Sequence, residues 1–338
     1  MSGVGAAGVA GAGTAGAGAA EAGVRGGVVV VGDALIDEFR TAEGSSDFVG
    51  GAGLNVATGL RILGVPSTLV AMVGDDSDGT LIRQFLAEYD VALVETLGRF
   101  GSSRAISDRT EGEPRYIFNE AAQKRHLAFD PATRRAFDEA ALVVVSCFPF
   151  DDTQQADALF AAVGAGGMDG AAGAGTAPGA AAATAAGAGR RLVLDPNPRA
   201  GMLSDRDAFV RNFERLAATS LLTKIGDEDC ELLYGEPLDT VAERLVRQGA
   251  ASVLATAGRA GASIRTAGGL RVDVPIAAFE GCVVDTMGAG DATLASTAAS
   301  IRQFGLPSSD EAWLELLERA MLIAAATCRH PGALLRLP

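Results

Sequence analysis

The stretch that most constrains this chain is Asp285–Asp291, which reads Asp-Thr-Met-Gly-Ala-Gly-Asp and precedes the small, apolar run 292–301. This run predicts a buried helix whose first turn contains the two glycines. The first N–H groups of a helix have no internal partner and lie at the positive end of its dipole, so they bind anions. Gly288, Ala289 and Gly290 leave the backbone bare enough for a phosphate to approach.

Asp291 follows this predicted anion hole directly. A carboxylate repels a phosphate, so its place there is better explained by proton transfer than by binding alone. It would act as a general base that takes the proton of a hydroxyl group while that hydroxyl attacks phosphorus. The alternative is structural, because Asp-Thr before a glycine-rich turn also caps and tightens the entry into a packed helix.

Composition limits the remaining chemistry. With 338 residues, of which 48% are hydrophobic, the chain can bury one large α/β core or two modest ones. The net charge of -14 and the lack of a basic cluster disfavour nucleic acid and anionic membranes as partners. His126 and His330 are the only histidines, which excludes a histidine metal cluster and disfavours a Ser/His/Asp triad. Base chemistry is therefore expected from carboxylates.

Two segments are almost entirely Gly and Ala. Residues 1–25 are predicted to be a disordered tail, and residues 164–190 a low-complexity insertion on the surface. Neither has the large apolar side chains of a signal peptide or a membrane helix. The four cysteines, Cys147, Cys230, Cys282 and Cys328, form no Cys-x-x-Cys pair and are interpreted as reduced core thiols of a cytoplasmic protein.

From residue 26 onward, β-branched runs alternate with helical segments, which predicts a mostly parallel sheet with helices on both faces. The run Val28–Val31 indicates a central strand, so Asp37 should emerge at the carboxyl edge, where open α/β sheets bind ligands. Asp37 could equally be a simple loop acid. Gly50 and Gly51 open the next predicted helix, and Asn55 can both donate to and accept from hydroxyl groups.

These stretches resemble the two signatures of the ribokinase family of carbohydrate kinases, also called the phosphofructokinase-B family. Gly50 to Asn55 is similar to its Gly-Gly-x-x-x-Asn signature, and Asp285–Asp291 to its Asp-Thr-x-Gly-Ala-Gly-Asp signature. The resemblance covers residues 26–338, and both signatures occur in the expected order. Together they are more specific than either glycine-rich run alone.

The resemblance implies one ribokinase-like α/β domain over residues 26–338, with a small β lid over the sugar site. The lid is expected from about residues 38–48 and 99–119, where the second range also alternates like a hairpin. Closing such a lid would exclude water that competes as phosphoryl acceptor. A homodimer through the lid is an arrangement that the resemblance allows.

The resemblance further implies an ATP-dependent sugar kinase that uses Mg²⁺ and admits K⁺. Asp291 would be the general base and Gly288, Ala289 and Gly290 the anion hole. The residues implied to hold the sugar hydroxyls are Asp37, Gly50, Gly51 and Asn55, those at the ATP phosphates are Thr256, Gly258 and Gly261, and those at a monovalent cation are Asp285 and Gly332.

The magnesium position departs from the family pattern. Where the family has Asn-x-x-Glu, this chain has Gly226 and Asp229. The shorter carboxylate of Asp229 could still hold Mg²⁺ through water, because Mg²⁺ keeps several of its waters. The alternative is that Asp229 only caps a helix.

The sequence does not fix which sugar accepts the phosphoryl group. The opening Gly-Asp-Ala-Leu-Ile-Asp is similar to fructokinase and ketodeoxygluconate kinase members, so a fructose-like sugar comes first, with ribose or a keto-sugar acid second. Aromatic residues make up 5% of the chain and offer little to stack on a purine. Two hypotheses of other classes are a sugar-binding regulator that lost catalysis and a nicotinamide-dependent reductase.

Overall fold

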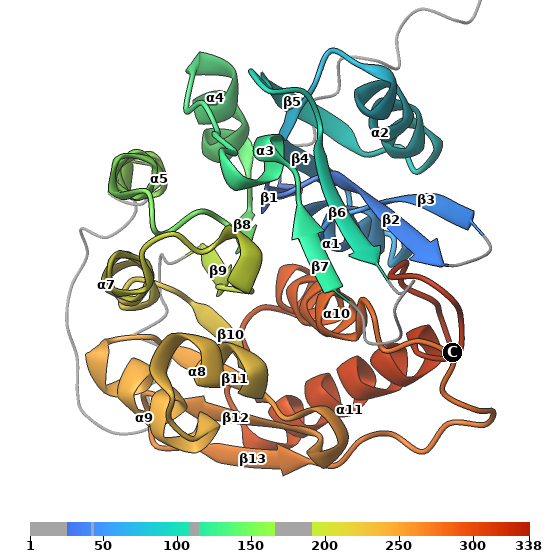
Figure 1. The fold of residues 1–338 in the computed structure, drawn as a ribbon. Helices are drawn as coiled ribbons and strands as arrows, with labels where there is room; N and C mark the ends of the chain where they lie inside the picture. Colours follow the sequence, from blue (N-terminus) through green and yellow to red (C-terminus); the bar gives the residue numbers. More distant parts are fainter. Residues whose placement is uncertain (1–25, 42–43, 109–114, 166–190) are drawn as a thin grey trace, which may run out of the picture.

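The computed structural model describes residues 26–41, 44–108, 115–165 and 191–338 (Figure 1). The predicted tail and residues 166–190 of the predicted insertion lie outside the described residues. The described chain forms a nine-stranded sheet and a separate four-stranded sheet. None of its helices is long and apolar enough to cross a membrane.

The main sheet is parallel over seven neighbouring strands, and antiparallel strands β12 and β13 complete one edge. This confirms the predicted fold class. In spatial order the strands are β13 (Arg271–Val274), β12 (Ala262–Thr266), β11 (Ser252–Thr256), β10 (Leu222–Gly226), β9 (Leu192–Asp195), β8 (Leu142–Ser146), β1 (Val28–Gly32), β4 (Ser67–Val73) and β5 (Ala92–Leu97).

The strand β1 explains why both faces of this sheet are covered. Its five residues are all buried, with Val28 and Val30 in one apolar cluster and Val29 and Val31 in another. A parallel strand buried on both sides needs helices on both sides. One face is covered by α1 (Ala52–Ile62), α2 (Ser77–Glu88), α10 (Ala289–Phe304) and α11 (Asp310–Thr327), and the other by α4 (Pro131–Glu139), α5 (Thr153–Ala165), α7 (Arg206–Ala217), α8 (Asp227–Tyr234) and α9 (Leu238–Gln248).

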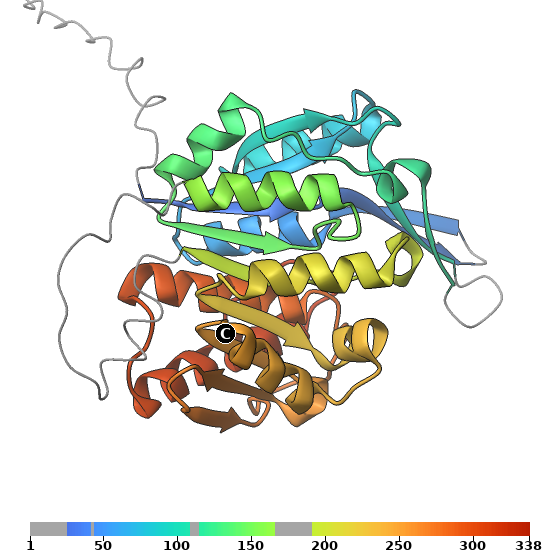
Figure 2. The same cartoon turned by 90° about the vertical axis from the view of Figure 1, so that its left-hand side faces the viewer.

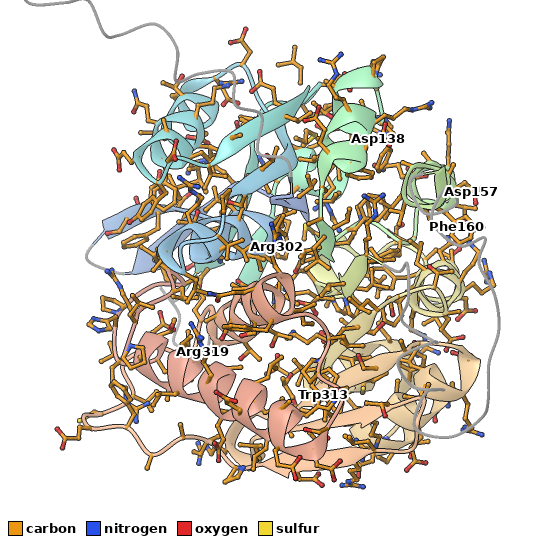
Figure 3. The ribbon with its side chains drawn as sticks, turned by 180° about the vertical axis from the view of Figure 1, so that it is seen from behind. Asp138, Asp157, Phe160, Arg302, Trp313 and Arg319 are labelled. Atoms are coloured by element: carbon orange, nitrogen blue, oxygen red, sulfur yellow. The ribbon has the colours of Figure 1, made fainter. Side chains whose placement is uncertain are left out.

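Figure 3 views the molecule from behind, and helices α10 and α11 are on the side that faces the viewer there. Trp313 on α11 is 1% exposed and belongs to the apolar cluster of that face. Arg302, near the end of α10, donates to the carbonyl oxygen of Gly26 just before β1. Short helical turns α3 (Glu120–Gln123), η1 (Ala200–Met202) and η2 (Gly258–Ala260) connect the other elements.

The four-stranded sheet, called the lid from here on, consists of β2 (Leu35–Thr41), β3 (Gly44–Gly50), β6 (Ser103–Asp108) and β7 (Arg115–Phe118). Its order is β3-β2-β6-β7. In Figure 2 the blue strands β2 and β3 project beyond the main sheet. The predicted β lid is therefore present, and β2 follows β1 after only two residues.

The strand order reverses at β1, which pairs with β4 on one side and with β8 on the other. Open α/β sheets form a crevice outside the carboxyl ends of the strands at such a reversal. The lid strand β2 leaves β1 at this same end. The fold therefore brings the lid, the start of α1 and the ends of β8 to β10 to one edge.

Helix α1 is held in place by apolar residues, and one variant tests this. Leu60 is fully buried, so Leu60→Ala should lower the free energy of unfolding by about 2–5 kcal/mol. The matched control is Leu81→Ala on α2, where the side chain is 45% exposed and a change within about 0.5 kcal/mol is expected. Urea unfolding measures both, and equal effects of the two variants would contradict the described packing.

Candidate active site

Helix α1 begins at Ala52, directly after Gly50 and Gly51, so Asn55 lies in its first turn. Its first amides are satisfied within the protein, because Gly53 N donates to Asp33 Oδ1 at 3.1 Å and Leu54 N to Asp33 O at 3.0 Å. The start of α1 is thus fastened to the end of β1. Sequence reasoning missed Asp33, because β2 and β3 separate it from α1 along the chain and no local capping pattern marks it.

The paired glycines allow a close approach of backbone and side chains. A Cβ at Gly50 would lie 2.3 Å from Asp37 Oδ2, and a Cβ at Gly51 would lie 2.8 Å from Asp33 O. Gly51 also has a φ of +110°, which side-chain-bearing residues rarely adopt. Both glycines therefore serve tight packing between strand and helix, and Gly50 in addition leaves room for the Asp37 carboxylate.

The start of α10 keeps part of its amides free. Gly288 caps the helix with a φ of +77°, and Ala289 N donates to Thr286 O at 3.3 Å. Within the described residues, the N–H groups of Gly288, Gly290 and Asp291 have no protein acceptor. Gly288 and Gly290 are also partly accessible. An anion can therefore reach most of the predicted anion hole, while Ala289 contributes less than expected.

Asp291 on α10 forms a hydrogen bond to α1 across the interface of these two helices. Asn55 Nδ2 donates to Asp291 Oδ2 at 2.9 Å, and each residue is 7% exposed. Burial raises the pKa of Asp291 to about 6, whereas the Asn55 hydrogen bond and the positive charge of Arg199 act in the opposite direction. A carboxylate with a pKa this close to neutral can both take up and release a proton.

Asp37 on β2 lies in the same electrostatic environment. Burial first, and then the charge of Asp33, raise its pKa to about 7, while Arg199 opposes the shift and Asp291 adds to it. Arg199 follows the end of β9 and is exposed. The structure therefore places Asn55 against Asp291 and puts Asp37 within reach of the charges of Asp291 and Arg199.

A buried lysine borders the anion hole. Lys224 Nζ on β10 lies 3.0 Å from Asp195 Oδ1, and Ser146 Oγ donates to the other carboxylate oxygen at 3.2 Å. A Cβ at Gly290 would lie 3.5 Å from the same Nζ. Burial disfavours the charge of Lys224, but Asp195 and Asp229 outweigh it, so the pKa stays above its ordinary value. Sequence reasoning missed Lys224, whose signal is a lysine inside a buried strand.

The predicted nucleotide loop follows β11. Gly258 and Gly261 have φ values of +47° and +94°, and a Cβ at Gly261 would lie 2.1 Å from Val274 O. Gly261 N donates to Gly258 O at 3.2 Å, so Gly261 shapes the turn. Thr256 pairs with Gly226 at the ends of β11 and β10. The loop thus lies at the same edge of the sheet as the anion hole.

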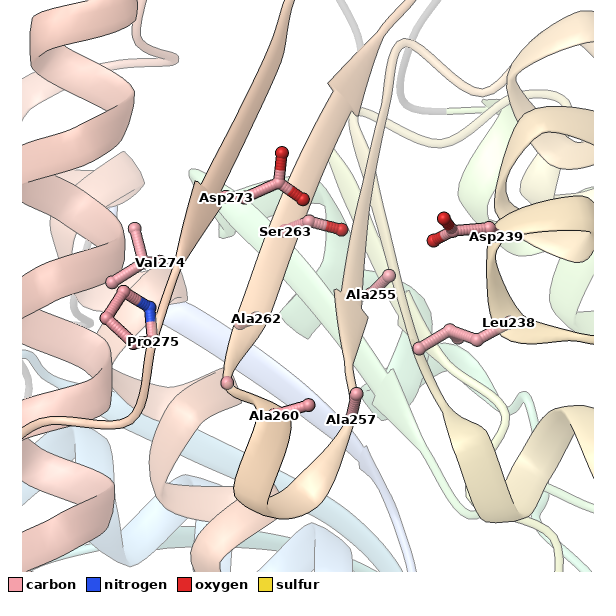
Figure 4. A pocket seen from close by; sticks show the side chains of 11 residues that line it. Leu238, Asp239, Ala255, Ala257, Ala260, Ala262, Ser263, Asp273, Val274 and Pro275 are labelled. Carbon is pink, nitrogen blue, oxygen red and sulfur yellow. The ribbon is translucent and has the colours of Figure 1, made fainter.

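A pocket of about 290 Å³ lies beside this loop (Figure 4). Ala257 and Gly261 line it on one side, and the carboxylates of Asp239 and Asp273 also belong to its wall. Two carboxylates disfavour a phosphate. None of the predicted sugar-site residues lines this pocket, so it is separate from the predicted sugar site, although Gly261 of the predicted nucleotide loop belongs to its wall.

The residues considered for metals have partners within the protein. Asp229 Oδ2 accepts from Gly226 N at 2.7 Å, so the capping alternative is present, and burial raises the pKa of Asp229. The other carboxylate oxygen remains for a water-mediated contact. The described residues contain no group of three or more His, Cys, Asp or Glu that could hold a metal. This still fits Mg²⁺ held mainly by phosphates and water.

Asp285 and Gly332, the residues predicted to lie at a monovalent cation, are in direct contact. Gly332 N donates to Asp285 Oδ2 at 3.1 Å, and Met287 N donates to Asp285 Oδ1 at 2.9 Å. Asp285 therefore ties the C-terminal loop to the turn that precedes α10. Backbone oxygens of this loop would be the cation ligands.

The cysteine prediction needs one correction. Cys147 and Cys230 are buried and Cys328 is half-buried, but Cys282 is exposed, so the interpretation as core thiols is wrong for Cys282. It lies in the segment before Asp285, which packs little apolar surface. All four cysteines are free.

Comparison with known proteins gives a family and named relatives. The family model for pfkB family carbohydrate kinases matches residues 27–338. A fructokinase of Rhizobium leguminosarum bv. trifolii is 28% identical over 82% of this chain and 81% of the relative. A fructokinase of Klebsiella pneumoniae is 26% identical over 93% and 97%. A 2-dehydro-3-deoxygluconokinase of Bacillus subtilis (strain 168) is 27% identical over 85% and 83%.

Solved structures share the fold. A fructokinase of Xylella fastidiosa with bound ATP has a TM-score of 0.71 at 19% identity, over 90% of this chain and 93% of that one. A fructokinase double mutant of Vibrio cholerae O395, with fructose, ADP and potassium ion bound, has a TM-score of 0.70 at 19% identity, over 91% and 94%.

The raised pKa of Asp37 predicts a stability effect with a definite sign. The folded state binds this proton more tightly than the unfolded chain, so deprotonation between the ordinary value of 3.8 and about 7 costs stability as the pH rises. Asp37→Asn removes the charge and should raise Tm by on the order of 3 °C at about pH 8, with no gain at about pH 4.

Differential scanning calorimetry at the two pH values measures this gain. Asp157→Asn, at an exposed aspartate on α5, serves as the matched control with no pH-dependent gain. A variant that is no more stable than the parent at the higher pH would contradict the raised pKa.

Proposed function

Because this chain belongs to the pfkB family of carbohydrate kinases, we propose that it transfers the γ-phosphoryl group of ATP to a hydroxyl of a fructose-like sugar. One observation carries the proposal. The buried Asp291 carboxylate, held by Asn55, follows directly on the free N–H group of Gly290. A base and an anion hole side by side are what in-line phosphoryl transfer to an alcohol needs.

In the proposed step, the O–H bond of the acceptor breaks and its proton passes to Asp291. The acceptor oxygen forms a bond to the γ-phosphorus, and ADP leaves with the electron pair of the broken P–O bond. The free amides at the start of α10 and the ammonium of Lys224 stabilise the charge on the moving group. Mg²⁺, when bound, would neutralise phosphate charge, with Asp229 as its carboxylate on the protein.

The remaining roles follow the same proposal. Asp37 and Asn55 would bind sugar hydroxyls, with the backbone of Gly50 and Gly51 beside them. The loop residues Thr256, Gly258 and Gly261 would lie at the ATP phosphates, and a K⁺ ion would bind to backbone oxygens near Asp285 and Gly332. Support comes from geometry, because these residues lie at the carboxyl edge of the sheet or at the turn before α10.

The choice of acceptor rests on the relatives' names and on the opening Gly-Asp-Ala-Leu-Ile-Asp. A keto-sugar acid is the second candidate, since one relative is named as a 2-dehydro-3-deoxygluconokinase. Ribose is a further candidate acceptor. A coupled ADP-release screen across hexoses, pentoses and sugar acids, with and without K⁺, tests this. We expect the highest kcat/KM with fructose. A higher kcat/KM with a sugar acid would make the sugar acid the proposed acceptor instead.

The general base is tested by Asp291→Asn, which keeps the shape of the side chain and removes its ability to take a proton. The value of kcat should fall by at least about 100-fold while Tm does not fall below that of the parent. Asp157→Asn is again the control. Unchanged turnover would refute the assignment, and a parent protein that binds sugar tightly without any turnover of ATP would favour the non-catalytic regulator.

The position of Asp37 is tested by Gly50→Ala. The new Cβ would lie 2.3 Å from Asp37 Oδ2 and must displace this carboxylate. We expect kcat/KM for the sugar to fall by about 10- to 100-fold, while KM for ATP changes little. Gly164→Ala is the matched control, because a Cβ there meets no atom within 4 Å. Equal sugar kinetics of the two variants would remove Asp37 from the acceptor site.

A further inference from the structure

We propose that Arg104 is a positioning residue, whose guanidinium fastens the lid to α2 and so fixes Asp37 over the acceptor. Arg104 lies on the lid strand β6, and none of the motifs that indicated the site includes it. The proposal deepens the proposed function and rests on it for the identity of the acceptor.

The guanidinium of Arg104 contacts three carboxylates from three elements. It binds Asp78 on α2 through Nε and Nη2, with Nη2 to Asp78 Oδ1 at 2.8 Å. Nη1 donates to Glu38 Oε2 on β2 at 3.0 Å, and Nη2 donates to Asp47 Oδ2 on β3 at 2.9 Å. A forked contact of this kind fixes direction as well as distance. One side chain therefore connects three strands of the lid to the start of a helix outside it.

The strand register places this contact behind Asp37. Arg104 is paired with Ile36 and Ala105 with Asp37 in the parallel pair β2 and β6. Neighbouring residues on a strand point to opposite faces of a sheet. Arg104 and Glu38 thus occupy the face that rests on α2, and Asp37 the opposite face. If the lid sheet shifts relative to α2, Asp37 on its other face shifts by the same amount.

A second contact ties β6 to the same helix. Asp76 caps α2 by accepting from Gly79 N at 2.7 Å. It also accepts from Ser102 N and Ser102 Oγ, both at 2.7 Å, directly before β6 begins. This contact holds the base of the lid strand. Arg104 lies two residues further along and sets the angle at which the strand leaves the body.

The charges explain why loss of Arg104 should act on the lid. The side chains of Arg104, Asp78 and Glu38 are 25%, 14% and 11% exposed, so the pairs are screened less than surface ion pairs. Without Arg104, the carboxylates of Asp78 and Asp47 would face one another across the boundary between lid and body. Glu38 retains Arg40 as a partner. Like charges on the two sides would then push the lid away from α2.

The test compares Arg104→Ala with the parent protein in two measurements. For the sugar that gives the highest turnover, KM should rise by about tenfold or more, whereas kcat and KM for ATP stay within about twofold. Hydrogen exchange should become faster at amides of residues 35–40 and 103–108 and stay unchanged in β8 and β9. Arg104→Lys, which keeps the charge but not the fork, should give an intermediate KM.

Two further variants make the test specific. Arg215→Ala removes an arginine from a more exposed ion pair, with Asp157 on α5, and should leave both measurements unchanged. Asp78→Asn should raise KM for the sugar, and adding Arg104→Ala to it should have less effect than in the parent, because the two residues share one interaction.

The outcomes separate the two proposals. Unchanged KM for the sugar together with unchanged exchange in the lid would overturn the role of Arg104. An equal loss in kcat and in both KM values, with a lower Tm, would also overturn it, since that pattern indicates general destabilisation. Should the parent protein phosphorylate none of the sugars tested, the proposed function fails, and the exchange measurement alone then decides whether Arg104 holds the lid.

Discussion

The hydrogen bond from Asn55 Nδ2 to Asp291 Oδ2 joins two helices whose residues are 236 positions apart in the chain. It forms only because α1 and α10 pack closely, as a Cβ at Gly59 would lie 3.0 Å from Ala295 Cβ. Without this donor, the burial of Asp291 would raise its pKa further. The packing of the two helices thus decides both where the carboxylate stands and how readily it accepts a proton.

Charge crowding at the carboxyl edge follows from the same packing. Burial raises the pKa values of both Asp37 and Asp291, and Arg199 counteracts both shifts. Lys224 is paired with Asp195 but borders the backbone at Gly290. Such perturbed groups reduce stability and gather where chemistry takes place. Under the proposed function, the anionic chain of a nucleotide would meet positive charge and bare amides here, and the acids would lie toward the acceptor.

In the lid, the local sequence pattern determines the strands, and long-range contacts determine which of their faces packs on the body. Alternation around a turn in residues 99–119 predicts strands, and the structure contains β6 and β7 there. The same alternation puts Arg104 and Ala105 on opposite faces, but it does not say which face meets the body. That depends on the pairing of β6 with β2 and on the placement of α2, which brings Asp78 to Arg104.

What the sequence determined by itself was local: the buried strand Val28–Val31, the glycine-rich turn before α10, and two signatures that identify residues such as Asn55 and Asp291. The order of strands in the sheet decided the rest. That order brings Asp33 to the first amides of α1 and Lys224 to Asp195, 29 residues away. Periodicity and turn chemistry describe neighbours along the chain, whereas these pairs form because separate strands end at one edge of one sheet.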